Sequence, residues 1–214
     1  MERQVISVDN FVITIARGYG SGGKTIGKML AKELGVNFYD RDILRMASDD
    51  SGISEALFAQ ADEKLKNTIL FKTAKNVYKG EIIPPDSEDF VSNDNLFNYQ
   101  AKVIKELAQK ESFVIAGRCA DYILKDFKNI IKVFVHAPLE HCIDVVSEMR
   151  NISRKDAMKY IEKTDKRRGE YYHYYTGKDW NDARNYDLCL NSGELDYERC
   201  VEIIKDYMGI KLKK

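Results

Sequence analysis

The feature that most constrains this chain is a glycine-rich stretch that directly follows a short apolar run. Residues 18–25 read Gly-Tyr-Gly-Ser-Gly-Gly-Lys-Thr and match the phosphate-binding pattern G-x-x-x-x-G-K-[ST]. The β-branched run Phe11–Ala16 before it predicts a buried strand, and the amphipathic segment Lys24–Leu34 after it predicts a helix. This strand–turn–helix order is the setting in which the pattern binds phosphate.

Each part of this stretch has a chemical purpose. Glycines allow backbone N–H groups to approach phosphate oxygens, and the following helix presents the positive end of its dipole. The Lys24 side chain is expected at the terminal phosphates, and the Thr25 hydroxyl is expected to ligate Mg²⁺. The alternative is a glycine-rich turn without a ligand. We expect a nucleoside triphosphate to contact Gly18, Gly20, Ser21, Gly22, Gly23, Lys24 and Thr25.

The rest of the chain alternates between predicted strands and helices. Strands are predicted at 36–39, 112–116, 130–135 and 186–190. Helices are predicted at 53–79 (with a possible break), 96–109, 139–150, 153–168 and 197–208. Residues 80–94, which contain adjacent prolines, predict an exposed loop. The alternation predicts one α/β domain with a parallel sheet, helices on both faces, and a ligand at the carboxyl ends of the strands.

The composition excludes several classes of protein. Lys plus Arg and Asp plus Glu both number 34, so the net charge is zero, which argues against a strongly basic nucleic-acid binder. No apolar run is long enough to span a bilayer, and the first residues lack the apolar segment of a secretory signal. We therefore expect a cytoplasmic protein with no nucleic-acid or membrane partner. The sequence does not indicate an oligomeric state.

Charged residues follow the second predicted strand. Asp40 and Asp42 are placed to serve Mg²⁺ or a substrate hydroxyl, and Arg41 and Arg45 are placed to hold an anionic acceptor. The alternative for Asp40 and Asp42 is that they cap the helix that starts near them. This segment is thus a candidate acceptor and metal site.

Two further groups of basic residues are candidates. Arg118 follows Gly117 at the end of the third strand, where an arginine suits phosphate contact; the alternative is a surface salt bridge. Arg167 and Arg168 lie late in a helix that can close over a transferring phosphate. Two alternatives to this role are a solvated charged face and, with the neighbouring tyrosines, a platform for single-stranded nucleic acid. The neutral composition argues against the latter.

These motifs together resemble the cytidylate-kinase-like branch of the nucleoside monophosphate kinases, within the P-loop NTPases. The resemblance spans nearly all of the chain. It rests on IARGYGSGGKTIG, LGVNFYDRDIL, IAGR, VFVHAP and the lid-like stretch DKRRGEYYHYYTGKDWNDARNYDLCLNSG.

The resemblance implies a three-layer α/β/α P-loop kinase fold with a five-stranded parallel sheet, in a single domain spanning 1–214. It implies an acceptor-binding insertion at about 41–95 and a lid at about 150–180. It also implies ATP and Mg²⁺ as donor and metal, and CMP or dCMP as the small-molecule acceptor. Lys24 and Thr25 would hold the donor phosphates and Mg²⁺, Arg118 would meet the acceptor phosphate, and Arg167 or Arg168 would act from the lid.

The chain departs from cytidylate kinases beside the Gly-Arg pair. Those enzymes carry a carboxylate on each side of the pair, whereas this chain has Ala116 and Cys119; their Asp-Ser after the second strand is Asp40-Arg41 here. The Asp-x-Asp motif formed by Asp40 and Asp42 also resembles the equivalent motif of shikimate kinases. Two alternatives therefore stay open, namely a kinase of another small hydroxylated metabolite and a nucleotide-binding regulatory protein without catalysis.

Overall fold

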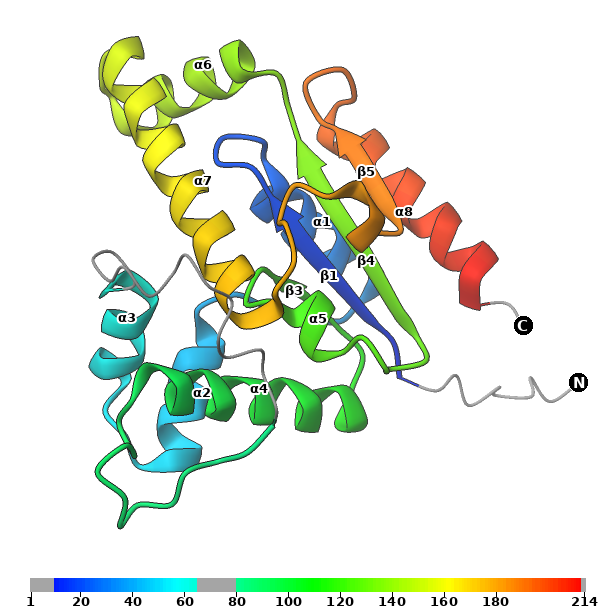
Figure 1. Ribbon diagram of the computed structural model, residues 1–214. Coiled ribbons are helices and arrows are strands. Elements are labelled where there is room, and N and C mark those ends of the chain that lie inside the picture. The colour runs from blue at the N-terminus through cyan, green and yellow to red at the C-terminus, as the bar shows by residue number, and fades with distance from the viewer. Residues whose placement is uncertain (1–9, 65–79, 213–214) are drawn as a thin grey trace, which may run out of the picture.

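The computed structural model describes residues 10–64 and 80–212 of the 214-residue chain. At its centre lies a parallel sheet of five strands in the order β2-β3-β1-β4-β5 (Figure 1). The strands are β1 (Val12–Arg17), β2 (Asn37–Tyr39), β3 (Phe113–Ala116), β4 (Ile130–His136) and β5 (Leu188–Asn191). The predicted α/β/α fold with a five-stranded parallel sheet is confirmed.

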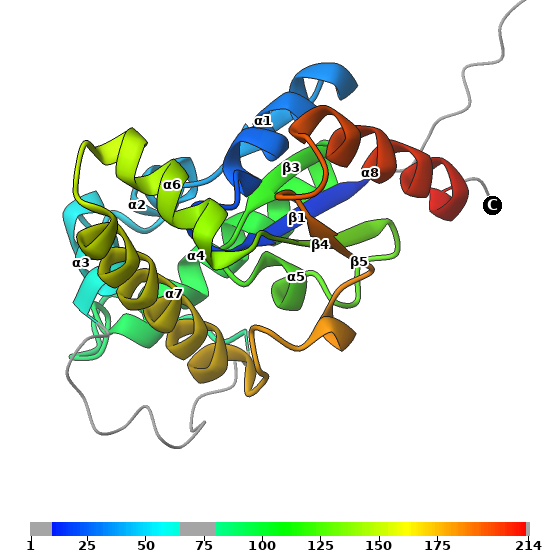
Figure 2. The ribbon, with the colours of Figure 1, turned by 90° about the horizontal axis from the view of Figure 1, so that it is seen from above.

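Helices connect the strands and cover the sheet. They are α1 (Gly23–Leu34), α2 (Asp42–Ser51), α3 (Glu55–Lys64), α4 (Asn93–Lys110), α5 (Ala120–Ile123), α6 (Leu139–Arg150), α7 (Arg154–Thr176) and α8 (Tyr197–Leu212). Helices α1 and α8 cover one face of the sheet, and α4 and α5 cover the other (Figure 2). Helices α6 and α7 form an antiparallel pair beyond the carboxyl ends of the strands (Figure 1). No helix in the described ranges is long and apolar enough to cross a membrane.

The sheet is buried on both sides, which explains the continuous apolar runs of its strands. Ile13 and Ile15 of β1 belong to the core beneath α1 and α8, whereas Val12 belongs to the core on the side of α4. All three side chains are fully buried. The two cores hold the carboxyl end of β1 in place, and the glycine-rich stretch begins directly after it.

The end predicted for the helix at 153–168 is wrong. Its start is confirmed, because the Ser153 side chain caps the helix by accepting a hydrogen bond from the backbone N–H of Asp156 at 3.1 Å. Helix α7 then continues through the tyrosine-rich stretch to Thr176 and ends at Gly177, whose φ is 68°. The reason is tertiary packing: Tyr172 and Tyr175 are buried in the core on the side of α4.

Other boundaries differ from the predictions by only a few residues, with three exceptions. The prediction does not include the four-residue helix α5 or assign an end to α2. The helix predicted at 53–79 corresponds to α3 as far as Lys64, and its remainder lies outside the described residues. The loop predicted at 80–94 is confirmed up to residue 92, after which α4 begins.

Candidate active site

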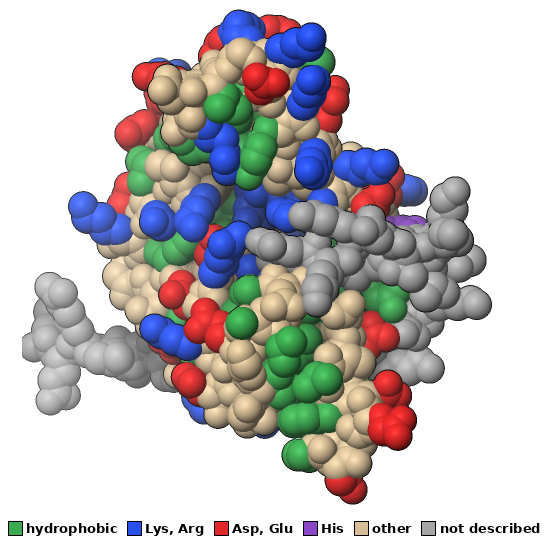
Figure 3. Space-filling model, turned by 90° about the vertical axis from the view of Figure 1, so that its left-hand side faces the viewer, with side chains coloured by type: hydrophobic (Ala, Val, Ile, Leu, Met, Phe, Trp, Pro, Cys, Tyr) green, Lys and Arg blue, Asp and Glu red, His purple; other side chains and the backbone are tan. Residues whose placement is uncertain are grey.

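A cavity of about 590 Å³ lies at the carboxyl ends of the strands, between the glycine-rich stretch and α7. Eight of its lining side chains are Lys or Arg and only two are Asp. Figure 3 shows Lys and Arg side chains gathered across the middle of the face that is turned to the viewer. A chain without net charge therefore concentrates positive charge at one site, as the binding of a polyanion requires.

The glycine-rich stretch forms a turn at the start of α1, which we call the phosphate cradle. Gly20 and Gly22 have φ angles of 88° and 74°, which side chains rarely adopt. Gly22 caps α1 without any side-chain hydrogen bond, and a Cβ at this position would overlap the ring of Tyr197. The first turn of α1 contains no acidic residue. The cradle thus fits an anion at the helix N-terminus.

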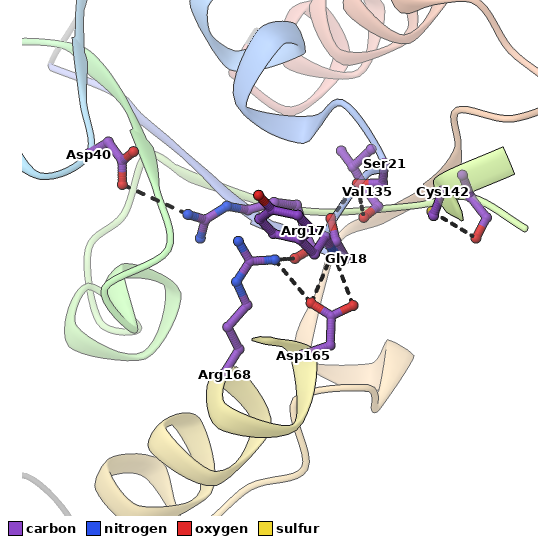
Figure 4. Close-up of polar contacts among 10 residues, drawn as sticks. Arg17, Gly18, Ser21, Asp40, Val135, Cys142, Asp165 and Arg168 are labelled. Carbon is purple, nitrogen blue, oxygen red and sulfur yellow. Dashed lines mark hydrogen bonds and ion pairs between the residues drawn. The ribbon is translucent and has the colours of Figure 1, made fainter. Parts of the chain in front are cut away.

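Ser21 has a structural role in this cradle. Its side chain is buried and donates hydrogen bonds to the backbone oxygens of Gly18, at 2.9 Å, and Val135, at 3.1 Å. Figure 4 shows these contacts beneath the loop. The hydroxyl therefore fixes the shape of the stretch and does not line the cavity.

Lys24 and Asp40 lie against each other at the floor of the cavity. Nζ of Lys24 donates a hydrogen bond to Oδ2 of Asp40 at 2.7 Å. Nη2 of Arg17 lies 3.8 Å from Oδ1 of Asp40, a contact that Figure 4 shows. Burial of Asp40 opposes its ionisation, but the hydrogen bond from Lys24 and the charge of Arg17 outweigh this effect and lower the pKa of Asp40. Asp40 is consequently a carboxylate, with its charge directed at Lys24.

Arg118 lies on a strained turn. Gly117, Arg118 and Cys119 have φ angles of 74°, 62° and 52°, so three consecutive residues are left-handed. Each non-glycine residue in this region costs about 1 kcal/mol or more. A Cβ at Gly117 would also overlap Nη1 of Arg17. The turn brings Arg118 to the lining of the cavity, which also includes Arg17.

Helix α7 is fastened to the glycine-rich stretch. Asp165 accepts hydrogen bonds from the backbone N–H of Tyr19, at 2.9 and 3.0 Å, and Arg168 donates to the backbone oxygen of Arg17 at 2.9 Å. Arg168 also donates to Asp165 at 3.1 Å (Figure 4). Burial raises the pKa of Asp165 and lowers that of Arg168, although the two groups stabilise each other's charge. These bonds set the distance between α7 and the phosphate cradle.

One face of α7 runs along the whole cavity. Its lining residues recur at helical spacing: Tyr160, Thr164, Arg167 with Arg168, and Tyr171 with Tyr172. At 1.5 Å per residue, Tyr160 and Tyr172 lie about 18 Å apart along the helix. The face therefore has aromatic rings at both ends and arginines in the middle.

The aromatic ends differ in their surroundings. At one end, Tyr19 and Tyr160 have ring centroids 5.1 Å apart, and the guanidinium of Arg150 lies 3.8 Å from the centre of the Tyr160 ring. At the other end, the Tyr172 hydroxyl donates a hydrogen bond to the buried carboxyl group of Asp121 at 2.6 Å, and Trp180 lines the same cavity. Arg150 at the first end is exposed, whereas the second end, called the enclosed end below, is lined by the buried side chains of Tyr172, Trp180 and Asp121.

The structure brings most of the predicted site residues together. Those that line the cavity are Gly18, Gly20, Gly22, Gly23, Lys24, Thr25, Asp40, Arg41, Arg118, Arg167 and Arg168. Asp42 and Arg45 are exposed on the first turns of α2 and do not line it, and neither does Ser21. The predicted clamp therefore contains Arg41 without Arg45.

Several residues of the site were missed by the sequence analysis. Arg17 ends β1 directly before the glycine-rich stretch, a position that marks it as a neighbour of the ligand. Asp121 follows Arg118 by three residues, in the short helix α5 that begins after the same strand. Nothing in the sequence links Tyr172 or Asp165 to these groups, because the contacts span 51 and 146 residues.

Thr25 and Asp40 fit a site for Mg²⁺. Both line the cavity beside Lys24, and the low pKa of Asp40 leaves a charged oxygen ligand. The described residues hold no group of three His, Cys, Asp or Glu side chains that could bind a metal without a ligand's help. The pair of Thr25 and Asp40 suits Mg²⁺, which proteins commonly hold through one or two side chains together with phosphates and water.

Known proteins resemble this chain along most of its length. Residues 12–194 match the cytidylate kinase-like family. Cytidylate kinase from Pyrococcus horikoshii is 26% identical over 199 residues, which cover 92% of this chain and 88% of that protein. Cytidylate kinase from Archaeoglobus fulgidus is 24% identical over 202 residues, covering 93% and 95%. An uncharacterized protein from Eubacterium ventriosum has a crystal structure with a TM-score of 0.69 and 27% identity, covering 94% of this chain and 99% of that one.

The family match and the geometry agree. The matched residues include the glycine-rich stretch, the left-handed turn and the cavity-lining face of α7. The class of enzyme is a phosphotransferase, and the chain belongs to the cytidylate kinase-like family.

Proposed function

We propose that this protein transfers the terminal phosphate of ATP to a nucleoside monophosphate, CMP or dCMP. The family membership supports a kinase. The acceptor is argued from the cavity itself, whose charge and aromatic content differ along its length.

The observation that carries the proposal is the face of α7 that lines the cavity. Tyr160 and Tyr172 lie about 18 Å apart along the helix, and Arg167 and Arg168 lie between them. Two nucleotides joined through their phosphates have this pattern, with a planar base at each end and negative charge in the middle. A small hydroxylated acceptor such as shikimate would leave the enclosed aromatic end without a base to contact.

The phosphate cradle and α1 hold the donor in this proposal. Lys24 exchanges its contact with Asp40 for the terminal phosphates, and Asp40 and Thr25 then serve Mg²⁺. The metal supplies charge neutralisation between the donor phosphates when it is bound. The open aromatic end, with Tyr19 and Arg150, receives the donor base.

The acceptor lies on the side of Arg118 and Arg41. Arg118 pairs with the acceptor phosphate, and the strained turn holds its guanidinium there. Arg167 and Arg168 offset the charge that develops on the phosphoryl group between the two nucleotides. Little covalent chemistry is required of the protein, since positioning and charge compensation supply most of the rate enhancement.

Two segments complete the site in this account. Residues 150–180 act as a lid, which Asp165 and Arg168 connect to the glycine-rich stretch by hydrogen bonds. Residues 41–95 contribute to acceptor binding through Arg41. Closure of the lid excludes water and suppresses hydrolysis of ATP.

The test is the production of ADP from Mg-ATP with a panel of acceptors: CMP, dCMP, UMP, AMP, GMP and shikimate. We expect a strong response to CMP or dCMP. A response to shikimate alone would identify a kinase of a hydroxylated metabolite. Bound ATP without turnover for any acceptor would favour a regulatory nucleotide-binding protein.

A further inference from the structure

Arg17 lines the cavity, but no step of the proposed phosphoryl transfer uses its side chain. It is the last residue of β1, directly before the phosphate cradle, and its side chain is 18% exposed. Figure 4 shows this side chain extending from the end of β1 toward Asp40. Arginine side chains are seldom this buried unless negative charge is paired with them. The role of Arg17 is therefore to be sought in the anions that it meets.

Two glycines leave the space that the Arg17 side chain occupies. A Cβ added to Gly23, at the start of α1, would overlap Cβ of Arg17. A Cβ added to Gly117, which follows β3, would overlap Nη1 of Arg17. Gly117 also begins the left-handed turn that carries Arg118. The guanidinium of Arg17 is therefore packed against the end of β3, beside the residue assigned to the acceptor phosphate.

The other terminal nitrogen of Arg17 faces the donor side. Nη2 lies 3.8 Å from Oδ1 of Asp40, whose Oδ2 accepts the hydrogen bond from Lys24. From above, Arg168 of α7 donates a hydrogen bond to the backbone oxygen of Arg17 at 2.9 Å. Arg17 thus lies between Lys24, which is assigned to the terminal phosphates of the donor, and the turn of Arg118. The phosphoryl group has to pass between these two places.

The charges around Arg17 favour an anion. Lys24, Arg17 and Arg118 all lower the pKa of Asp40, so three cations of the described residues act on this one carboxylate. Asp165 also lies within range of the Arg17 charge, but it is paired with an arginine of α7 itself. The excess of positive charge suits the phosphoryl group, which stays negatively charged throughout its transfer.

We infer that Arg17 binds the phosphoryl group that is transferred, from the floor of the cavity, as a catalytic residue in addition to Lys24 and Arg118. Its planar guanidinium can donate to two phosphoryl oxygens at once. The inference deepens the proposed function and rests on it for the effect of Arg17 on the rate, although not for its effect on binding. Since ADP lacks the group that Arg17 contacts, ATP and ADP are a matched pair of probes.

The experiment measures the affinities of ATP and ADP by calorimetry for the wild-type protein and Arg17→Gln, at a low and at a high concentration of Mg²⁺. Glutamine keeps part of the length of the side chain and removes its charge. We expect the affinity for ATP to fall by about tenfold or more at both concentrations and the affinity for ADP to stay unchanged. Arg199→Gln, which changes an exposed arginine on α8, is the control and keeps both affinities.

Turnover of the same proteins tests the catalytic part of the inference. The kcat of Arg17→Gln should fall by about tenfold or more, while the KM for the acceptor stays unchanged. Arg17→Lys keeps the charge without the two-pronged donor, so its ratio of ATP to ADP affinity should lie between those of wild type and Arg17→Gln. Circular dichroism checks the fold, and Arg17→Lys carries the test if Arg17→Gln does not fold.

An equal fall in the affinities for ATP and ADP overturns the inference, because that result identifies a structural side chain. A loss of ATP affinity that high Mg²⁺ restores also overturns it, because Arg17 would then act only through Asp40 and the metal. An unchanged ratio of the two affinities does the same. A selective loss of ATP affinity in a protein that turns over no acceptor supports the phosphoryl contact and contradicts the proposed kinase reaction.

Discussion

The two ends of the cavity are built in opposite ways. The phosphate cradle consists of eight consecutive residues, 18–25, whose backbone turns at the start of α1. The enclosed end consists of side chains from α5, α7 and the segment after α7, with Asp121, Tyr172 and Trp180 brought together from distant parts of the chain.

The difference explains which properties each end can have. A cradle made of backbone N–H groups recognises phosphate, which every nucleotide shares, and tolerates few changes. An end made of side chains can recognise one base and can change its preference by single substitutions. We therefore expect changes in the cradle to affect all substrates and changes at the acceptor side to affect only one.

The largest effect is expected from Lys24→Ala. Its ammonium group is the main charge of the cradle, so ADP production should fall about a hundredfold or more for every acceptor, with the fold intact because the side chain is exposed. Turnover assays with circular dichroism measure both effects. Lys32→Ala, on the last turn of the same helix, is the control. Normal turnover in Lys24→Ala would show that the cradle has no role in catalysis.

Arg118→Ala should weaken binding of the acceptor without changing binding of ATP. Loss of a charge-assisted contact to the acceptor phosphate should raise the KM for the acceptor by about tenfold or more and leave the affinity for ATP unchanged. Steady-state kinetics and ATP titration provide the two values. Arg45→Ala, an exposed arginine outside the cavity, should change neither. If the affinity for ATP fell and the KM for the acceptor stayed unchanged, Arg118 would contact the donor nucleotide instead.

Gly22→Ala tests whether the cradle depends on its backbone. A side chain at φ 74° costs about 1 kcal/mol and would also displace Tyr197, so ATP affinity should fall by about tenfold. Gly35→Ala, with φ 66° and no atom near the added Cβ, should show a similar loss in urea unfolding but retain ATP binding. Equal ATP binding in the two variants would contradict the account of the cradle.

The smallest effect concerns the stability that Asp40 contributes. Because its folded pKa lies below the usual value near 4, the contribution is present above pH 4 and is lost as the pH falls through the folded pKa. Urea unfolding of wild-type protein and Asp40→Asn should differ by about 1 kcal/mol at pH 7, since Lys24 is half exposed to solvent. The difference should shrink below pH 4. A constant difference would show that Lys24 and Arg17 do not stabilise the charge of Asp40.

The sequence predicted the backbone-built part of the molecule well. The order of strands and helices follows from apolar periodicity, and the cradle follows from one contiguous motif. The end of α7 was misplaced because buried Tyr172 and Tyr175, rather than local preference, carry the helix past Gly169. Tertiary packing of this kind cannot be predicted from a short stretch of sequence.

The candidate site shows the same limit. Lys24, Asp40 and Arg118 each end a strand or begin a helix at the same edge of the sheet, so their meeting could be expected. The contact between Asp121 and Tyr172 depends on how α7 lies across α5, which no local pattern determines. The burial of Ser21 likewise depends on β4, because Val135 accepts its hydrogen bond.

The central claim is that the two ends hold two nucleotides between which a phosphate moves. The most direct measurement is chromatography of the nucleotides formed from Mg-ATP and CMP by wild-type protein and Lys24→Ala. We predict that ADP and CDP appear in equal amounts with the wild-type protein and that both almost disappear in the variant. ADP without CDP, or no products although both nucleotides bind, would contradict the account.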